Sequence, residues 1–346
     1  MVTPPQSLMM PLMRHPTPRE TMDSEQIRQD RNQLLQAGGM VRLEWTLLRV
    51  FGRDAATFLH NMTTNDVRSL NIDSFCESYV LDVRGKIVAH GFIIRLADES
   101  FLFLGGPGQM ATLTAHWERF VIAEDVQFEC GAAQMSVWAA AGPFVDEWNN
   151  DLDDTKNGQL QAGVLFDVPV KWMPMAVFGG RTKLVVLRTV EQRSALTDNA
   201  ERRGLLSLMP DTWESLRIEA GFPLYGVDIT IENLPQEVCR NLQAINFNKG
   251  CYLGQETVAR IDAIGHVNWH LVGLKCGKTG LTSGQELKQG TKTIAKIGSQ
   301  AWIPQLDCHL ALAYVRRGSE SPGTQLQTDD GDLEVVGLPV TSDTHS

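Results

Sequence analysis

The sequence predicts an α+β protein built from two units of mixed helices and antiparallel strands, followed by an all-β domain. In residues 40–131, strand and helix patterns follow the order β-α-β-β-β-α-β, which is typical of a split βαβ or ferredoxin-like unit. Residues 132–265 repeat a similar order of elements without recognisable identity to the first unit. In residues 266–340, short apolar runs alternate with glycine-rich turns and no helical period is present, which indicates a small barrel or sandwich.

Length and composition are those of an ordinary globular protein with two or three domains. The chain has 346 residues, of which 43% are hydrophobic and 21% are charged. No apolar run approaches the roughly 18 residues of a membrane span, and the N-terminus lacks a secretory signal, so we expect a cytoplasmic protein without a membrane partner. The net charge of -10 opposes a nucleic-acid partner, which would require a basic surface. The six cysteines form no CxxC or CxxH pair, so we predict reduced thiols and no metal site.

The first unit is preceded by a segment without periodicity. Residues 1–24 are rich in proline, methionine and threonine, and we predict a disordered extension there, followed by a helix at 25–37. Within the unit, Asp54 is a favourable N-cap and Arg84-Gly85 predicts a tight turn between two strands. The predicted elements are a strand at 41–51, a helix at 54–61, strands at 76–83, 86–96 and 100–105, a helix at 107–121 and a strand at 126–129.

The second unit begins with a strand and ends with a capped helix. The helix starts after Asp211 with carboxylates in its first turn, and Gly221 ends it. The elements predicted before it are a strand at 135–142, a helix through 148, a hydrophilic loop at 150–160, strands near 165–170 and 183–190, and a helix near 190–201.

One stretch, residues 248–260, concentrates reactive side chains: a thiol, an amine, a carboxylate, an amide and a guanidinium. Gly250 and Gly254 predict a turn, and the residues after Gly254 have the pattern of a first helical turn. Cys251 should therefore lie on a loop near a helix N-terminus with Lys249 close by, and both features favour the thiolate. The alternative is a tight turn with a half-buried structural cysteine.

Residues 249–256 match the KGCYxGQE signature of the YgfZ family at each position. This family comprises folate-binding relatives of the glycine-cleavage T-protein (GcvT), an aminomethyltransferase. Residues 52–67 are similar to its G-x-D-A, F-L and T-N-D-V motifs, and residues 216–226 and 234–237 to the R-x-E-A-G-x-P-x-Y-G and L-P-x-E motifs. The matches run in the expected order from about 42 to 275, so the chain resembles this family over most of its length.

The resemblance implies a three-part cloverleaf. Two ferredoxin-like units, together residues 25–265, and a C-terminal β-barrel, residues 266–340, would surround a central hole that holds tetrahydrofolate or a derivative. It also implies a role in the assembly or repair of iron–sulfur clusters, with iron–sulfur proteins or assembly factors as partners.

Two departures from the family patterns bear on the reaction. His60-Asn61 stands where the family often has Gln-Gly. The T-protein's catalytic aspartate lies in a G-G-x-x-D-D segment, and the matching run here, 85–90, has no carboxylate. An acid that positions the folate N5 and protonates the leaving amine is needed for aminomethyl transfer, which makes this reaction disfavoured. A folate-dependent aminomethyl or methyl transferase or demethylase remains the alternative, and a scaffold with purely structural folate is a third.

The signature supplies the residues that we predict to carry the chemistry, Cys251 and Lys249. Cys251 could be a nucleophile, a redox thiol or a cluster ligand, and since a cluster takes about four thiolates, the last role requires ligands from a partner. Lys249 could pair with the anionic folate tail or lower the pKa of Cys251, and its alternative is a solvated lysine.

The predicted folate site is spread over several segments. The resemblance places Glu219 against the pteridine, where a carboxylate can accept two hydrogen bonds at once. Turn residues, tyrosines that could stack on the rings and residues of the signature helix complete the set: Asn65, Asp66, Tyr225, Tyr252, Gln255 and Arg260. Each has a structural alternative, as a turn, core or ion-pair residue, and we expect Arg217 to be a structural ion-pair partner. The pair His266/His270 falls at a predicted strand start, so we predict no metal site there.

Overall fold

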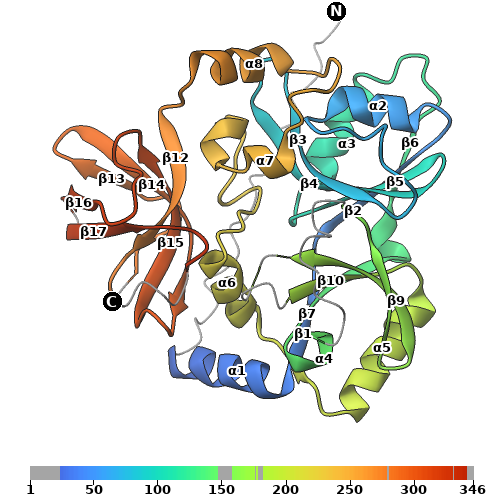
Figure 1. Cartoon of the computed structure of the whole chain (residues 1–346), viewed down its shortest axis with the longest axis horizontal. Coiled ribbons are helices and arrows are strands. Elements are labelled where there is room, and N and C mark those ends of the chain that lie inside the picture. Colours follow the sequence, from blue (N-terminus) through green and yellow to red (C-terminus); the bar gives the residue numbers. More distant parts are fainter. Residues whose placement is uncertain are drawn as a thin grey trace, which may run out of the picture.

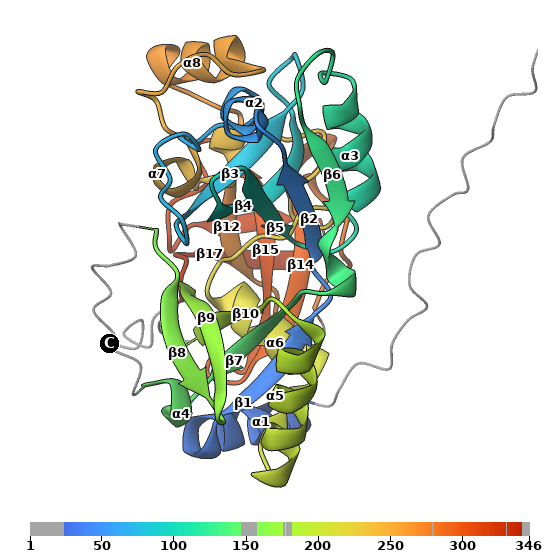
Figure 2. The same ribbon diagram turned by 90° about the vertical axis from the view of Figure 1, so that its right-hand side faces the viewer.

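The computed structural model describes residues 24–146, 158–175, 177, 182–278, 280–329 and 331–340. The described strands form three sheets around the centre of the molecule (Figure 1). Figure 2 shows the first sheet above the second, with the strands of the third sheet behind both. None of the described helices is long and apolar enough to cross a membrane.

The first sheet is antiparallel and is buried on both faces. Its order is β3-β4-β5-β2-β6, and alternate residues of β5 face opposite cores, Phe101 and Phe103 towards two helices and Leu102 and Leu104 towards the second sheet. The two helices are α2 (Ala55–Met62) and α3 (Met110–Glu118). The strands are β2 (Thr46–Phe51), β3 (Phe75–Leu81), β4 (Ile87–Ala97), β5 (Ser100–Gly105) and β6 (Gln127–Cys130).

The second sheet contains one parallel pair, between β1 and β11, and is otherwise antiparallel. Its order is β11-β1-β7-β10-β9-β8. The strands are β1 (Gly39–Leu43), β7 (Ser136–Ala141), β8 (Gln161–Leu165), β9 (Val168–Met175), β10 (Thr182–Leu187) and β11 (Leu206–Ser207). The associated helices are α1 (Ser24–Ala37), α4 (Pro143–Asp146), α5 (Val190–Arg202) and α6 (Pro210–Glu219).

The third sheet is a nearly closed all-β barrel, which confirms the expected C-terminal all-β region. Its order is β13-β14-β15-β12-β17-β16. The backbone N–H of Asp329, next to β16, donates to Lys288 O in β13 at 2.9 Å, so the two edge strands lie side by side. The strands are β12 (Trp269–Lys275), β13 (Glu286–Gln289), β14 (Lys292–Ile303), β15 (Cys308–Arg316), β16 (Gln325–Thr328) and β17 (Gly331–Val336).

The segment between α6 and the barrel crosses the centre of the molecule (Figure 1). It contains the short 3-10 helix η3 (Pro235–Val238), α7 (Asn241–Ala244) and α8 (Gln255–Ile264). This segment carries the signature loop and contributes to a buried cluster shared by the first sheet, α6, α8 and the barrel.

Most of the predicted elements are present, and two strand predictions are wrong. The expected strand 41–51 is two strands, because the chain leaves the second sheet after Leu43 and enters the first at Thr46. The expected strand 165–170 contains a turn at Phe166-Asp167, where φ is 50° and 66° without a glycine signal. Of the predicted extension 1–24, residues 1–23 lie outside the described residues, and Ser24 begins α1. The segment 147–157, including the end of the helix through 148, also lies outside them.

Candidate functional site

All four tyrosines of the chain converge on the central buried cluster, although they are far apart in the sequence. Tyr79, Tyr252 and Tyr314 belong to it, and Tyr225 packs against it. The hydroxyls of Tyr79 and Tyr314 are buried and have no hydrogen-bond partner among the described residues. Burial raises the pKa of both well above the ordinary value. Both hydroxyls therefore remain protonated and able to donate a hydrogen bond at neutral pH.

Beside the tyrosines lies a buried ionic group formed by Glu77, His90 and Arg240. The Arg240 guanidinium donates two hydrogen bonds of 2.6 Å to the two oxygens of Glu77, and His90 Nε2 lies 2.8 Å from Glu77 Oε1. Burial acts to raise the pKa of Glu77, but the Arg240 charge and these hydrogen bonds outweigh it and lower the pKa to about 2. Glu77 is therefore ionised at neutral pH, and both of its oxygens are engaged.

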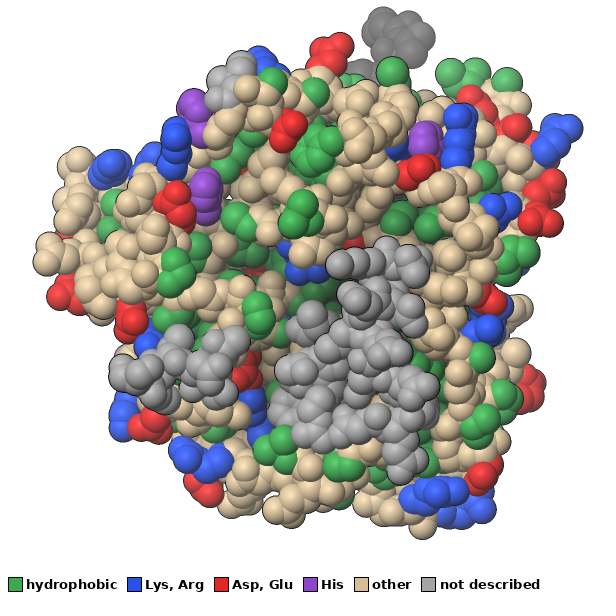
Figure 3. Space-filling view, in the orientation of Figure 1, with side chains coloured by type: hydrophobic (Ala, Val, Ile, Leu, Met, Phe, Trp, Pro, Cys, Tyr) green, Lys and Arg blue, Asp and Glu red, His purple; other side chains and the backbone are tan. Residues whose placement is uncertain are grey.

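The ionic group is enclosed by aromatic rings. The Arg240 guanidinium lies 5.2 Å from the ring centre of Phe222, which is a cation–π distance. Phe222 in turn stacks on Trp45 and Phe92 with centroid distances of 6.1 and 6.2 Å. In Figure 3 the molecular face is hollowed near its centre, where hydrophobic, acidic and basic side chains are visible together. This combination of flat rings, fixed charge and unpaired hydroxyls can hold a polar aromatic molecule.

The signature loop is anchored by Lys249. Its ammonium donates to three backbone carbonyls at the end of α2, those of His60, Thr63 and Asn65, the last two at 2.7 and 2.8 Å. It also lies 5.0 Å from the ring centre of Tyr252. Burial lowers the pKa of Lys249 to about 8. All three N–H donors are used within the protein, so Lys249 holds the loop and has no donor left for an anionic tail.

Cys251 is exposed on this loop, a few residues before α8 begins, as the glycine pattern predicts. The α8 N-cap, Gly254, has φ 81° and packs so closely on the β3–β4 turn that an added Cβ would lie 2.6 Å from Asp82 O. The preceding residue, Leu253, donates its backbone N–H to the carbonyl oxygen of Asn61 in α2 at 2.9 Å. The thiol is therefore presented to solvent on a loop that is held at both ends.

Asn65 and Asp66 have local partners. The Asn65 amide donates to Glu77 O and Gln243 O at 2.9 and 3.0 Å, so it joins β3 to α7. Asp66 Oδ1 lies 3.1 Å from His60 Nδ1. Burial acts to raise the pKa of Asp66, but hydrogen bonds from Ser69 and nearby positive charge hold it below the ordinary value. Both residues thus support the polar loop that receives Lys249.

Glu219 lies on α6, apart from the signature loop and α8 (Figure 1). Its carboxylate forms an ion pair with Arg31 of α1, a buried residue that also donates to Ser215 Oγ at 2.9 Å. The structure thus brings Glu219 together with the N-terminal helix. Arg217, two positions earlier in α6, is fully buried and paired with Asp228 at 3.0 Å, which confirms the expected structural ion pair.

The remaining predicted residues lie in the signature loop, in α8 and at the edge of the central cluster. Tyr252 is buried, and burial raises its pKa to about 12. Tyr225 is half-buried, and burial raises its pKa as well. Gln255 begins α8, and its N–H donates to Tyr252 O at 3.2 Å. Arg260 is exposed on α8. No group of three or more His, Cys, Asp or Glu side chains in the described ranges is arranged to hold a metal ion.

Sequence reasoning did not find the central ionic group. Glu77 and Arg240 are 163 positions apart, and no motif or spacing connects them. The strand pattern of the β3–β4 hairpin could have indicated part of this group, because the register of the hairpin places Tyr79 opposite His90.

Comparison with known proteins relates most of the chain to aminomethyltransferases and to YgfZ proteins. The GCVT N-terminal domain family matches residues 16–179. An aminomethyltransferase from Thermus thermophilus is 25% identical over 277 residues, covering 79% of this chain and 78% of that protein. The tRNA-modifying protein YgfZ from Yersinia enterocolitica is 29% identical over 230 residues, covering 63% of this chain and 64% of that protein. These matches support the placement of the chain in a YgfZ/GcvT-like superfamily.

The fold is similar to that of a solved aminomethyltransferase. The crystal structure of glycine cleavage system aminomethyltransferase T from Bartonella henselae superposes with a TM-score of 0.75, covering 91% of this chain and 90% of that chain at 21% identity. The similarity of fold therefore extends beyond the residues that the domain family matches.

Proposed function

We propose that this YgfZ/GcvT-like protein binds tetrahydrofolate or a derivative at the central hollow and assists the assembly or repair of iron–sulfur clusters in the cytoplasm. The observation that carries the proposal is the convergence of Tyr79, Tyr314, Phe222 and the Arg240–Glu77 pair where the three sheets meet. The partners would be iron–sulfur proteins or their assembly factors.

The residues at the centre fit a folate. Two buried hydroxyls without a partner, those of Tyr79 and Tyr314, are disfavoured unless a bound molecule supplies acceptors. The half-buried Tyr225 offers a flat surface for a pterin or a p-aminobenzoate ring. When bound, tetrahydrofolate supplies nitrogen atoms that carry one-carbon units, and the role of the protein is to hold and orient it.

Cys251 supports the second half of the proposal. The thiol is exposed while its loop is fixed by Lys249 and Gly254. An exposed thiol on a fixed loop can contact a second protein without a folding change. Because a cluster takes about four thiolates, the other ligands would come from the partner.

Isothermal titration calorimetry with tetrahydrofolate tests the folate site. We expect saturable binding by the wild-type protein and several-fold weaker binding by Tyr79→Phe and Tyr314→Phe. Removing an unpaired buried hydroxyl leaves the fold intact, so thermal unfolding should be unchanged in both variants. Absence of detectable heat with the wild-type protein would remove the folate proposal.

Complementation separates the thiol role from folate binding. In a strain that lacks this protein and is deficient in an iron–sulfur enzyme, we expect Cys251→Ser to fail to restore that enzyme while keeping wild-type affinity for tetrahydrofolate. Cys130→Ser, at another exposed cysteine, is the matched control and should restore activity. Full restoration by Cys251→Ser would exclude the thiol role.

A folate-dependent aminomethyl transfer is the second candidate, and Glu77 is the observation that favours it. This carboxylate lies 2.8 Å from Nε2 of His90. His90 belongs to the segment 85–90, which contains no acidic residue of its own. However, Arg240 and His90 occupy both of its oxygens, and it is ionised at neutral pH. Turnover of a protein-bound aminomethyl donor with tetrahydrofolate would establish this activity, and its absence in a protein that binds the folate would leave the first proposal standing.

A further inference from the structure

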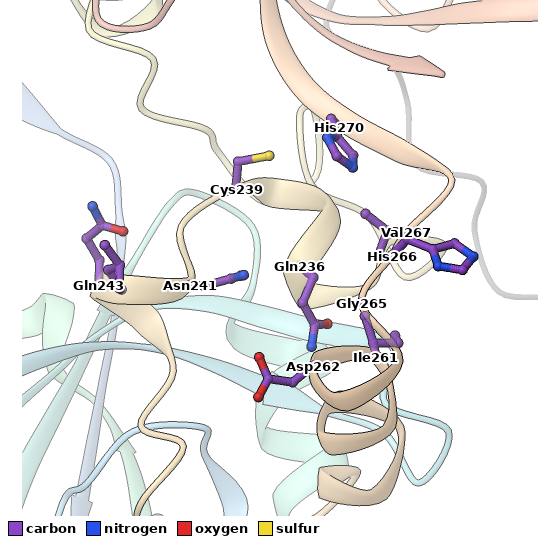
Figure 4. A pocket seen from close by; sticks show the side chains of 11 residues that line it. Gln236, Cys239, Asn241, Gln243, Ile261, Asp262, Gly265, His266, Val267 and His270 are labelled. Carbon is purple, nitrogen blue, oxygen red and sulfur yellow. The ribbon is translucent and has the colours of Figure 1, made fainter. Parts of the chain in front are cut away.

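A separate pocket lies between α8, η3–α7 and the start of β12 (Figure 4). Its volume is about 530 Å³, within the range of roughly 300–1,000 Å³ that is usual for small-molecule sites. Cys251 and the central ionic group are not among the residues that line it. The proposed folate site and this pocket are therefore distinct.

Gln236 supplies a buried acceptor without a partner on the wall of this pocket. The side chain is only 8% exposed, and its Nε2 donates to Val258 O at 2.9 Å, which fixes the orientation of the amide. The other amide atom, Oε1, has no partner among the described residues. Leaving a buried acceptor unpaired costs about 1–3 kcal/mol, so a ligand that donates a hydrogen bond here is favoured.

Two further lining residues offer an acceptor or a negative charge, beside Gln243, Cys239 and two histidines that can also donate. Asn241 Oδ1 has no partner among the described residues. Asp262 is exposed on α8 and is the one lining side chain of the Asp, Glu, Lys and Arg types among the described residues. The C-terminal end of α8, which Gly265 closes, directs its last carbonyls to this region and adds partial negative charge.

The view in Figure 4 shows how these groups face the cavity. Gln236 and Asp262 lie at one end, Asn241 extends from the adjacent wall, and Cys239 and His270 lie at the opposite end. His270 Nδ1 is 3.6 Å from Glu320 Oε1, which places a further carboxylate beside that end. An anionic ligand would meet no lysine or arginine among the described lining residues and would be repelled by Asp262.

We propose that this pocket binds a small organic cation that carries a primary ammonium or a guanidinium group. Such groups donate several hydrogen bonds and bear a positive charge. They therefore match the free oxygens of Gln236 and Asn241 and the carboxylate of Asp262. The pocket volume accommodates a short chain with a charged group at each end.

Calorimetry on the full chain with agmatine and with putrescine tests this proposal, and 1,4-butanediol serves as the uncharged analogue of putrescine. We expect saturable binding of at least one of the two cations and none of the diol. Asp262→Asn keeps the shape and removes the charge, so its affinity for the cation should fall about tenfold or more. Asp198→Asn, at an exposed aspartate of α5, is the matched control and should bind as the wild type does.

Three results would overturn the assignment: no saturable heat with either cation, equal binding of the diol, or equal binding by Asp262→Asn and the wild type. Because Asp262 is exposed and forms no ion pair with the described residues, its replacement leaves folding intact. A change in cation affinity therefore reports on the pocket.

Discussion

A buried carboxylate is stable only when its charge is compensated, and Glu77 shows how the compensation is achieved. Only 6% of the residue is exposed, yet the charge of Arg240 and the contact with His90 lower its pKa to about 2. In the unfolded chain the pKa returns to about 4.5. The ionised form is thus favoured by folding, and its contribution to stability is complete above pH 4.5 and is lost as the pH falls towards 2.

The variant Glu77→Gln tests this linkage. At pH 7 it leaves the guanidinium of Arg240 without a counter-charge, so we expect a loss of about 3 kcal/mol in the free energy of unfolding. Between pH 4.5 and 2 the stability of the variant should fall less steeply than that of the wild type, because the linked protonation is absent. Urea unfolding followed by tryptophan fluorescence at pH 7, 5 and 3 measures both effects.

Glu256→Gln provides the control for this experiment. Glu256 is exposed on α8, so its replacement should change the stability by less than about 0.5 kcal/mol at each pH. Parallel pH profiles for Glu77→Gln and the wild type would show that Glu77 is not the linked group.

At the scale of elements, the signature loop is an example of a motif that contacts two other elements at once. Lys249 binds the carbonyls that end α2, and Gly254 rests on the turn between β3 and β4. Gly85 in that turn faces Thr257 of α8, with only 2.7 Å between an ideal Cβ at Gly85 and Thr257 Cβ. Gly254 of the motif and Gly85 of the hairpin are thus needed for the close approach of α8 to the turn.

Two glycines at the ends of α8 allow the contact to be separated from backbone strain. Gly254 and Gly265 both have positive φ, 81° and 92°, so alanine costs about 1–2 kcal/mol at either position. At Gly254 the added Cβ would also lie 2.6 Å from the backbone oxygen of Asp82, whereas no atom lies within 4 Å at Gly265. We expect Gly254→Ala to lose at least about 2 kcal/mol more than Gly265→Ala.

Chemical denaturation of the two glycine variants measures this difference. The rate of alkylation of Cys251 should also change in Gly254→Ala, because the loop is displaced. Equal stability of the two variants would mean that the β3–β4 hairpin moves to accommodate the added Cβ without loss of stability. The contact at Gly254 would then not fix the loop.

At the scale of the whole molecule, a buried polar network attaches the barrel to the rest of the chain. Arg217 of α6 donates to Asp228 at 3.0 Å and to Ser299 of β14 at 2.8 Å. Asp228 accepts in turn from the Ser299 N–H at 2.7 Å and from the Leu224 N–H at 2.9 Å. Arg217 and Asp228 are fully buried. Asp228 depends on Arg217 for charge compensation, whereas Arg217 is compensated by Asp228 together with Glu214.

Replacing Asp228 by alanine should therefore loosen the barrel. We expect Asp228→Ala to lose about 3 kcal/mol, since it removes one of the two carboxylates that compensate the buried guanidinium and leaves the Leu224 and Ser299 N–H groups without their acceptor. Glu214→Ala removes the other carboxylate that contacts Arg217, but that side chain is 35% exposed, so a loss of no more than about 1 kcal/mol is expected. Hydrogen exchange in β14 and β15 measures the loosening, and similar protection in both variants would contradict it.

Local patterns in the sequence were sufficient to predict which segments form helices or strands and which superfamily the chain resembles. The helix at 25–37, the hairpin around Gly85 and the all-β C-terminal region are each encoded within one segment, because hydrophobic period and turn chemistry are local properties. The signature at 249–256 identified the superfamily for the same reason: its residues are contiguous.

Contacts between distant segments were decided only by the tertiary structure. Nothing local to residues 41–51 indicates that the chain changes sheets after Leu43, because both strands share one alternation. The Glu77–Arg240 pair depends on the placement of α7 against β3 and not on sequence spacing. The cation pocket likewise forms only where α8 and η3 meet. The sequence thus determined the elements and the signature, whereas packing decided which charges and hydroxyls meet, because burial and pairing are properties of the assembled fold.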